Sequence, residues 1–524
     1  MRSTRVLWNV VTNYLRLLLA AGVGVVLTPF MVHHLGDRDY GLWVTVFSLT
    51  SYFGLFDQGI RPSLVRYVSR DHAVGDHEGL ARTINSAVVL YTLVGALTMA
   101  AAAIAAANAH ALLRVDTTLL PVAPTLLLLL GATLAIGFPL GVFGAVLSGL
   151  QRYDVANGIG IVVGVLRLVA FTLVLHLGGG LVALAWTQLV VNLFGHGWSW
   201  VAARRLLPGV RLGGEWVRRE AIRRIAQYGG WALIGALASN IAFQTDSLVI
   251  TACLGAALAT PFAMCAGLVE ASRSLVYGAA WVLAPTASEM DTLGEGDKLR
   301  AMYVAGSKYA VLLAWPVLIG MIVFGSNLLT TWVGARYASA SLLLTILAVP
   351  TMVALPQAIA SSVLFGVSRH RGVVLLSLTA ALLNLGLSIL WARSPGPMRA
   401  LFGTTVSPGL VGVAMGTAVP QACVSGMGIA VFACRALGEP LLRYAWQGLL
   451  QPGLVTLAFL GPALLVQRAW HPLGWLPLMG SCAACWTVFA AAAWTVGISP
   501  SDRTRWGRMI AGLVARPRPA EARG

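Results

Sequence analysis

Residues 31–70, MVHHLGDRDYGLWVTVFSLTSYFGLFDQGIRPSLVRYVSR, decide the fold class of this chain. A short polar corner separates two long apolar runs, and the second run carries Asp57 and Arg61 in its interior. A charged side chain at the centre of a membrane span costs about 2.5–3.5 kcal/mol, so it is retained mainly where it faces protein, an opposite charge or a wet cavity. The stretch therefore predicts membrane helices joined by tight corners, with an interior that is polar at a few positions.

The composition of the whole chain agrees with a membrane protein. Hydrophobic residues make up 58% of the 524 residues and charged residues only 10%, whereas a soluble domain carries roughly 25% charged residues. The net charge of +17 is spread over short segments between apolar runs. A nucleic-acid partner is therefore not expected, because that function needs basic side chains on one folded face.

About fourteen membrane helices are predicted, since a bilayer core requires about 20 apolar residues per helix. The predicted spans are 12–32, 40–65, 83–107, 121–148, 157–177, 181–203, 228–254, 258–285, 304–326, 338–366, 373–392, 409–433, 446–466 and 473–496. Of the 36 Lys and Arg residues, 26 lie in connections and ends on the side of the N-terminus and six on the opposite side. Because positive loops stay in the cytoplasm, both termini are expected there.

A basic, amphipathic segment at 204–225 divides the chain and is expected to lie along the inner membrane surface, near anionic lipid headgroups. The predicted organisation is an N-terminal lobe of six spans, this cytoplasmic connector, a C-terminal lobe of six spans, two additional spans and a basic cytoplasmic tail. The corresponding ranges are 1–203, 204–225, 226–435, 436–498 and 499–524.

The two six-span lobes share a weak internal repeat. Leu35-Gly36 and Leu254-Gly255 close corresponding corners, and each pair precedes a long span with charges in its second half. This repeat predicts an all-α membrane fold in which two six-helix lobes are related by a pseudo-two-fold axis along the membrane normal, plus two C-terminal helices. Chance recurrence is the alternative, because Leu and Gly are abundant.

Four arginines lie inside four different predicted spans. Arg binds phosphate oxygens with a planar fork of N–H donors and stays protonated, so the set predicts a cationic chamber for a phosphate or pyrophosphate headgroup. Arg167 is the strongest candidate, since its span has no acidic residue one turn away. The predicted substrate-binding residues are Arg167, Arg16, Arg61, Arg273 and Asn13, which shares a helical face with Arg16.

Each charge also has a purely structural interpretation. The pairs Asp57–Arg61 and Glu270–Arg273 have helical spacing and would neutralise themselves, and Arg16 would only extend toward the inner surface. Asp246 has no local base, so it is predicted to bind a proton or Na⁺, with a cross-helix hydrogen bond as the alternative. The three predicted ion-coupling residues are Asp246, Asp57 and Glu270.

No catalytic constellation is recognised. His33 and His34 lack further ligands at metal spacing, and no phosphate loop of the G-x-x-x-x-G-K-[ST] type occurs. We therefore expect no enzyme activity, no catalytic residue, no metal and no cofactor.

Several motifs resemble a known family. Leu35-Gly36-x-x-x-Tyr40-Gly41-Leu42-Trp43, Asp57-x-Gly59 and Arg66-Tyr67 are similar to the opening of bacterial polysaccharide transporters, the Wzx-like members of the MOP exporter superfamily, as is Gly149-Leu150-Gln151-Arg152-Tyr153. The resemblance implies a flippase in the bacterial inner membrane that moves an undecaprenyl-pyrophosphate-linked oligosaccharide to the periplasmic leaflet. It also implies alternating access with ion coupling. The flippase would take part in exopolysaccharide, capsule, lipopolysaccharide or O-antigen synthesis, with a polysaccharide polymerase and a chain-length regulator as partners.

Two other functions were weighed against the flippase. A multidrug and toxin extrusion antiporter of the same superfamily would favour a chamber rich in acids, because its drugs are cationic. A membrane polysaccharide polymerase or ligase would be expected to carry a large external loop with catalytic Arg or His. The longest external connection here is only about 393–408.

Overall fold

The computed structural model describes residues 2–112, 118–228, 230–280, 283–498 and 503–504. Side chains of residues 2–11 and of several positions between 227 and 243 are outside the description. The described chain is helical and contains no strand, which confirms the all-α class. Nearly all of the predicted tail, 499–524, lies outside the described residues.

The first half of the chain forms the helices up to the second Leu-Gly corner. Their bounds are α1 Arg2–Phe53, α2 Leu55–Ala73, α3 His77–Ala107, α4 Ala109–Leu112, α5 Val122–Gly149, α6 Tyr153–His176, α7 Leu181–Leu206, η1 Gly214–Trp216, α8 Arg219–Tyr228 and α9 Gly230–Leu254.

The second half continues in the same manner, with three π-helical stretches (η3, η4 and η5) that widen the helices they interrupt. Its elements are α10 Ala256–Ala280, α11 Leu283–Thr292, α12 Gly296–Val323, α13 Gly325–Trp332, η2 Ala335–Ala340, α14 Ser341–Ala354, α15 Gln357–Gly366, α16 Arg371–Arg393, α17 Gly396–Phe402, α18 Pro408–Pro420, η3 Gln421–Gly428, α19 Ile429–Leu437, α20 Leu441–Tyr444, η4 Ala445–Leu450, α21 Gln451–Val455, α22 Leu457–Ala469, α23 Trp475–Ala492 and η5 Ala493–Gly497.

Ten helices in the described part of the chain are long and apolar enough to cross a membrane. The first of them, Leu15–Phe53, covers most of the predicted span 12–32 and the first half of 40–65, because two helices are merged across the Gly36 corner. The helices outside this count include α7, α9 and α10, which carry polar interior residues such as His196, Asp246 and Glu270. The chain is therefore a multi-pass membrane protein.

Both Leu-Gly corners depend on the conformational freedom of glycine. Gly36 has φ +77° and ψ 173° within the merged helix α1, and Gly255 has φ +103° between α9 and α10. Residues with a side chain rarely adopt this backbone region, and a non-glycine residue held there costs of order 1–3 kcal/mol. The repeated Leu-Gly pair thus has a local physical cause at both corners.

Replacing Gly36 with alanine is expected to destabilise the protein by about 1–3 kcal/mol through this backbone strain. No atom lies within 4 Å of the Cβ position of Gly36, so the loss would not come from a steric clash. The midpoint of thermal unfolding in detergent should fall for Gly36→Ala and stay level or rise for Gly22→Ala, whose Cβ position is also open and whose φ is helical. Equal midpoints for the two variants would contradict the assignment of strain to the corner.

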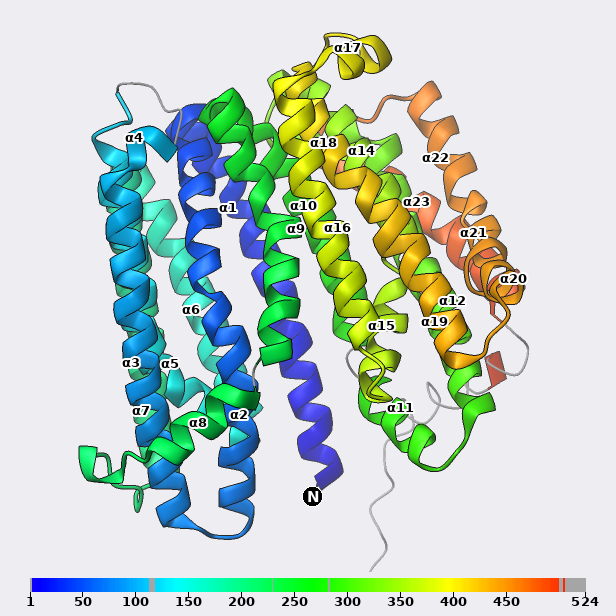
Figure 1. The fold of residues 1–524 in the computed structure, drawn as a ribbon. Helices are drawn as coiled ribbons and strands as arrows, with labels where there is room; N and C mark the ends of the chain where they lie inside the picture. The colour runs from blue at the N-terminus through cyan, green and yellow to red at the C-terminus, as the bar shows by residue number, and fades with distance from the viewer. Residues whose placement is uncertain (1, 113–117, 229, 281–282, 499–502, 505–524) are drawn as a thin grey trace, which may run out of the picture.

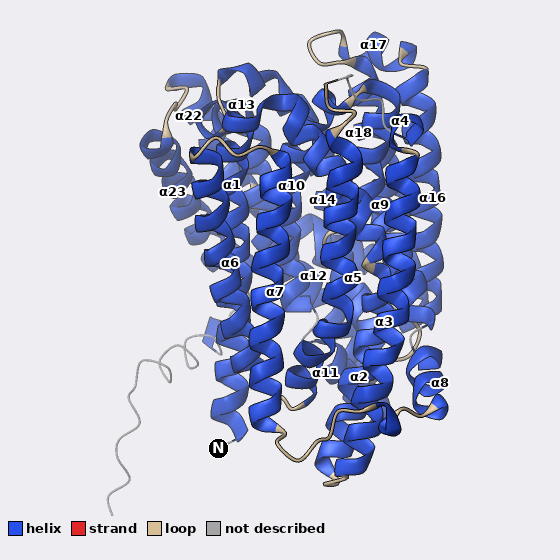
Figure 2. Ribbon diagram, turned by 90° about the vertical axis from the view of Figure 1, so that its left-hand side faces the viewer, coloured by secondary structure: helices blue, strands red, loops and turns tan. Residues whose placement is uncertain are grey.

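The helices form two groups (Figure 1). One group contains α2, α3, α5, α6 and α7, with extensive contact between α3 and α5 and between α5 and α7, while the other contains α9 to α19. Helix α1 rises from the N-terminus between them and contacts α6 on one side and α9 and α10 on the other. Figure 2 shows that the axes of the long helices are roughly parallel to one another. The predicted domain boundaries remain a prediction.

The predicted connector is held against the first group of helices. Asn85 of α3 donates to the carbonyl of Arg211 at 2.9 Å and accepts from the backbone N–H of Gly213 at 2.9 Å. The guanidinium of Arg224 on α8 lies 4.4 Å from the ring centroid of Tyr67 on α2. These contacts lay α8 across one end of the helices, as Figure 1 shows.

Candidate functional site

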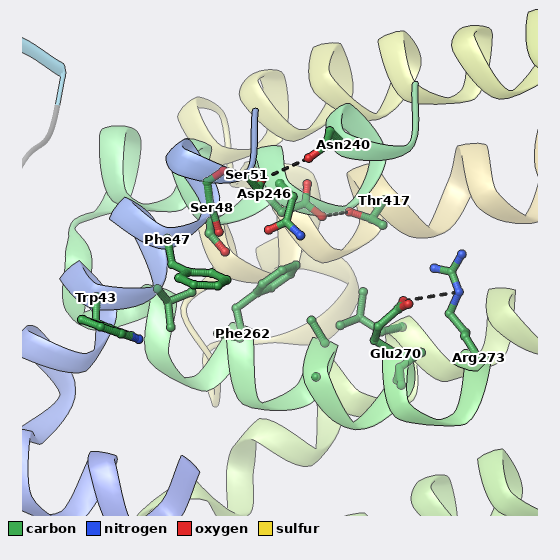
Figure 3. Close-up of a pocket in the computed structure, with 18 of the residues that line it drawn as sticks. Trp43, Phe47, Ser48, Ser51, Asn240, Asp246, Phe262, Glu270, Arg273 and Thr417 are labelled. Atoms are coloured by element: carbon green, nitrogen blue, oxygen red, sulfur yellow. Dashed lines mark hydrogen bonds and ion pairs between the residues drawn. The ribbon is translucent and has the colours of Figure 1, made fainter. Parts of the chain in front are cut away.

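A cavity of about 600 Å³ lies where α1 meets the second group of helices. Its wall is formed by α1, mainly the part after the Gly36 corner, together with residues of α2, α9, α10, α14, α18 and η3 (Figure 3). Residues of both sequence halves therefore line one hollow. Such a concave site with a few convergent polar groups is the usual form of a small-molecule binding site.

Aromatic rings and neutral polar groups cover most of this wall. Phe47 of α1 and Phe262 of α10 present rings to the hollow (Figure 3). Ser51 donates to the Asn240 side-chain oxygen at 3.0 Å, which joins α1 to α9 at the cavity edge. In the α1 sequence after the corner, aromatic and polar residues recur every three or four positions. They therefore lie on one face of the helix, and this face forms part of the cavity wall.

Two of the predicted site residues, Glu270 and Arg273, line the cavity from α10. The Arg273 Nε lies 3.6 Å from Glu270 Oε2, and the guanidinium lies 5.7 Å from the ring centroid of Tyr277. The Glu270 side chain is 58% exposed, whereas the Arg273 side chain is 11% exposed. The charge that this wall offers to a ligand is thus mainly that of the carboxylate.

Asp246, also in the wall of this cavity, belongs to a buried cluster of oxygens. Thr417 donates to Asp246 Oδ2 at 2.6 Å, and Ser388 lies 3.5 Å from Asp246 Oδ1 and donates to Asn384 Oδ1 at 3.0 Å. The carbonyl oxygen of Val413 lies 3.3 Å from both hydroxyls. Asp246 is only 3% exposed, so α9, α16 and α18 bury a carboxylate among neutral oxygen atoms.

The sequence analysis missed the partners of Asp246. Asn240 and Gln244, which precede Asp246 on α9, line the cavity. The signal for the true partners was present as two helical i, i+4 pairs, Asn384 with Ser388 and Val413 with Thr417, but nothing local pointed to α9. Only packing brings the three helices together.

The other three predicted arginines lie among the first group of helices and outside the cavity wall. Arg16 donates to Asn13 Oδ1 at 3.3 Å, and its Cδ is 2.9 Å from the Cβ position of Gly160, so this glycine of α6 makes room for the side chain. Arg167 donates to Asn192 Oδ1 of α7 at 3.2 Å. In the described part of the chain, the buried Nε atoms of Arg16 and Arg167 have no hydrogen-bond partner.

Arg61 and Asp57 form an ion pair on α2, with 3.6 Å between Arg61 Nη1 and Asp57 Oδ2. Tyr91 of α3 donates to the other carboxylate oxygen at 2.7 Å. Arg61 Nη2 lies 3.6 Å from the position that a Cβ atom would take at Gly144 of α5. Gly137 of the same helix leaves space for the His196 ring. Tyr91 and His196 were not among the predicted residues, although both are polar groups in otherwise apolar helices.

The structure therefore divides the predicted set in two. Arg61, Arg167 and Asp57 belong to the first group of helices, and Arg16 and Asn13 lie on α1 where it meets α6. Asp246, Glu270 and Arg273 line the cavity. The described residues contain no cluster of three or more His, Cys, Asp and Glu side chains that could hold a metal ion.

The Gly36 corner of α1 is tied to the second group of helices. Thr260 of α10 donates to the carbonyl of Asp37 at 2.7 Å, and Arg336 Nη2 lies 3.3 Å from the Asp37 carboxylate, which also accepts from Tyr337. Farther along, the hydroxyls of Thr45 and Thr251 are 2.6 Å apart. Polar contacts thus hold α1 against the second group of helices at the Gly36 corner.

Comparison with known proteins gives both a family match and a fold match. The family model described as "Polysaccharide biosynthesis protein" matches residues 6–291, more than half of the chain. No curated protein matches the sequence significantly.

Two solved structures illustrate the fold match. An inward-facing multidrug resistance MATE family transporter of the MOP superfamily is 17% identical, with a TM-score of 0.66, and the alignment covers 82% of this chain and 95% of that one. The lipid II flippase MurJ in an inward closed conformation is 10% identical, with a TM-score of 0.69, and the alignment covers 93% and 98%. At these identities the likeness shows the fold alone, which is that of MOP superfamily transporters.

Proposed function

The chain belongs to the polysaccharide biosynthesis protein family, and from this premise we propose that it is a flippase for an undecaprenyl-pyrophosphate-linked oligosaccharide repeat unit. It moves this lipid across the bacterial inner membrane for exopolysaccharide, capsule, lipopolysaccharide or O-antigen synthesis. Both termini lie in the cytoplasm, in accord with the distribution of Lys and Arg. A polysaccharide polymerase and a chain-length regulator are the expected protein partners, and no catalytic step is required.

The observation that carries the proposal is the set of intramembrane arginines in the first group of helices. Arg16 and Arg167 each keep a buried Nε without a partner in the described part of the chain, and their Nη2 groups donate only to neutral amides there. A buried donor left unsatisfied costs about 1–3 kcal/mol, more for a charged group. A pyrophosphate would supply the missing acceptors and the opposite charge.

Asp246 supplies the coupling-ion site of the proposed mechanism. Its polar partners Thr417, Ser388 and Asn384 are all neutral, so a bare carboxylate would be buried without charge compensation. Such a charge is strongly destabilising. A bound Na⁺ would compensate it through the surrounding oxygen atoms, and a proton would remove it. Asp57 and Glu270 already face arginines, so Asp246 is the main coupling residue.

The contacts at the Gly36 corner support an alternating-access mechanism. In this conformation Asp37 links α1 to α10 and η2, so a substrate cannot leave between these elements. Export requires that these contacts break while the opposite side closes. The affinity of substrate and ion for the two conformations must then differ, since a ligand shifts a conformational equilibrium only through differential binding.

A transport assay separates this function from ion-coupled drug export. The purified protein is reconstituted in vesicles with an undecaprenyl-pyrophosphate-linked oligosaccharide whose glycan bears a fluorophore, and a membrane-impermeant quencher reports the leaflet. We expect the protected fraction to change with time only in vesicles that contain the protein and an ion gradient. Gradient-driven uptake of cationic dyes without movement of the lipid would establish the antiporter alternative instead.

A further inference from the structure

The cavity between α1 and the second group of helices has a lining that suits a carbohydrate. Phe47 is 48% exposed and faces Phe262 across the hollow (Figure 3). The C–H face of a sugar ring packs on an aromatic ring, and the aromatic surface costs little conformational entropy when it binds. Phe262 is only 2% exposed, so the Phe47 ring provides the surface on which a sugar can lie.

Amide groups on the same wall remain available to a ligand. Gln58 of α2 and Gln244 of α9 line the cavity, and neither side chain makes a hydrogen bond within the described part of the chain. An amide offers two N–H donors and a carbonyl acceptor, which match the donor and acceptor capacity of sugar hydroxyls. Two amides without hydrogen-bond partners in the described part of the chain, in a wall that also carries aromatic rings, therefore favour a polyhydroxylated ligand.

The accessible charge of the cavity is negative. The Glu270 carboxylate is largely exposed, whereas its ion-pair partner Arg273 is mostly covered and lies near the Tyr277 ring. Asp246 lines the same wall but is only 3% exposed, so Glu270 is the accessible carboxylate. Arg16, Arg61 and Arg167 lie outside the wall, and Arg273 within it is only 11% exposed, so the exposed charge of this hollow is mainly that of Glu270.

From this lining we infer that the cavity is the glycan subsite of the transporter, that it accepts uncharged or amine-bearing sugars, and that it excludes uronic acids. The inference rests on the proposed flippase function and specifies the sugar class. A carboxylate accepts hydrogen bonds from sugar hydroxyls and attracts an ammonium group, while two like charges that approach in a partly dehydrated site repel each other. Selectivity of this kind comes from a repulsive element as much as from attractive contacts.

The test compares two lipids that differ at one sugar. Both carry the same undecaprenyl pyrophosphate and a disaccharide that ends in either glucose or glucuronic acid, and equilibrium binding to the detergent-solubilised protein is measured by fluorescence polarisation. Wild-type protein should bind the glucose lipid at least tenfold more tightly, the ratio that one unfavourable charge contact gives. Glu270→Gln should raise the affinity for the glucuronate lipid about tenfold and so bring the ratio of the two affinities close to one.

Glu220→Gln is the matched control, because Glu220 lies exposed on α8 and outside the cavity wall. This variant should keep the wild-type ratio. Equal affinities of wild-type protein for the two lipids, or a preference for glucuronate, would overturn the inference and leave the flippase proposal intact. Failure of both lipids to bind would overturn the two proposals together. The wild-type comparison decides the matter even if a variant does not fold.

Discussion

Arg167→Ala is expected to abolish movement of the lipid-linked oligosaccharide while the protein still inserts and folds. The guanidinium holds Asn192 through one N–H at 3.2 Å and keeps a buried Nε without a partner among the described residues, so most of its hydrogen-bonding capacity is free for a pyrophosphate. A charge-assisted hydrogen bond contributes about 1.5–3 kcal/mol. Loss of two such bonds would weaken headgroup binding by a factor of at least 100.

The measurement is the rate of lipid movement in reconstituted vesicles, with export of the cell's polysaccharide as a second readout. Arg167→Lys should keep partial activity, because a point charge replaces a planar fork. Arg399→Ala, an exposed position on α17, is the control and should transport at the wild-type rate. Full export by Arg167→Ala would remove this arginine from the binding site.

Asp246→Asn is expected to uncouple transport from the ion gradient. Asparagine has nearly the shape of aspartate and keeps hydrogen-bond contact with Thr417, Ser388 and Asn384, but it carries no charge that Na⁺ or a proton could neutralise. Because a buried charge without compensation is removed, the variant should be at least as stable as the wild type in the absence of the ion. Its thermal midpoint should no longer rise when the ion is added.

The readouts are transport rate and thermal midpoint, each with Na⁺, with K⁺ and over a range of pH. A response to Na⁺ that disappears in Asp246→Asn identifies sodium as the ion, and a response to pH alone that disappears identifies the proton. Asp291→Asn, exposed on α11, should behave as the wild type. Unchanged ion dependence in Asp246→Asn would mean that the cluster is a structural hydrogen-bond network.

The separation of charges links these two predictions. The arginines proposed to hold the pyrophosphate lie with the first group of helices, whereas the acidic groups line the cavity beside the second group. A single cationic chamber formed by all four arginines, as the sequence suggested, would have left no distinct surface for the glycan. The observed arrangement instead separates the arginines proposed to bind the pyrophosphate from the cavity proposed to bind the glycan.

The sequence by itself determined the class of protein, the helical architecture and the two tight corners, because these follow from local physics. Apolar runs of sufficient length specify membrane helices, and a glycine specifies each corner, since Gly36 and Gly255 have positive φ values. The ion pairs Asp57–Arg61 and Glu270–Arg273 also follow from helical spacing within single helices.

The tertiary structure alone decided which side chains meet. Tyr91 reaches Asp57 across 34 residues and Thr417 reaches Asp246 across 171 residues, and no local pattern encodes either contact. It also decided that Arg273 is covered while Glu270 is exposed, which sets the charge of the cavity. The physical reason is that helix spacing fixes a residue's position on its own helix, whereas burial and partners depend on how separate helices pack.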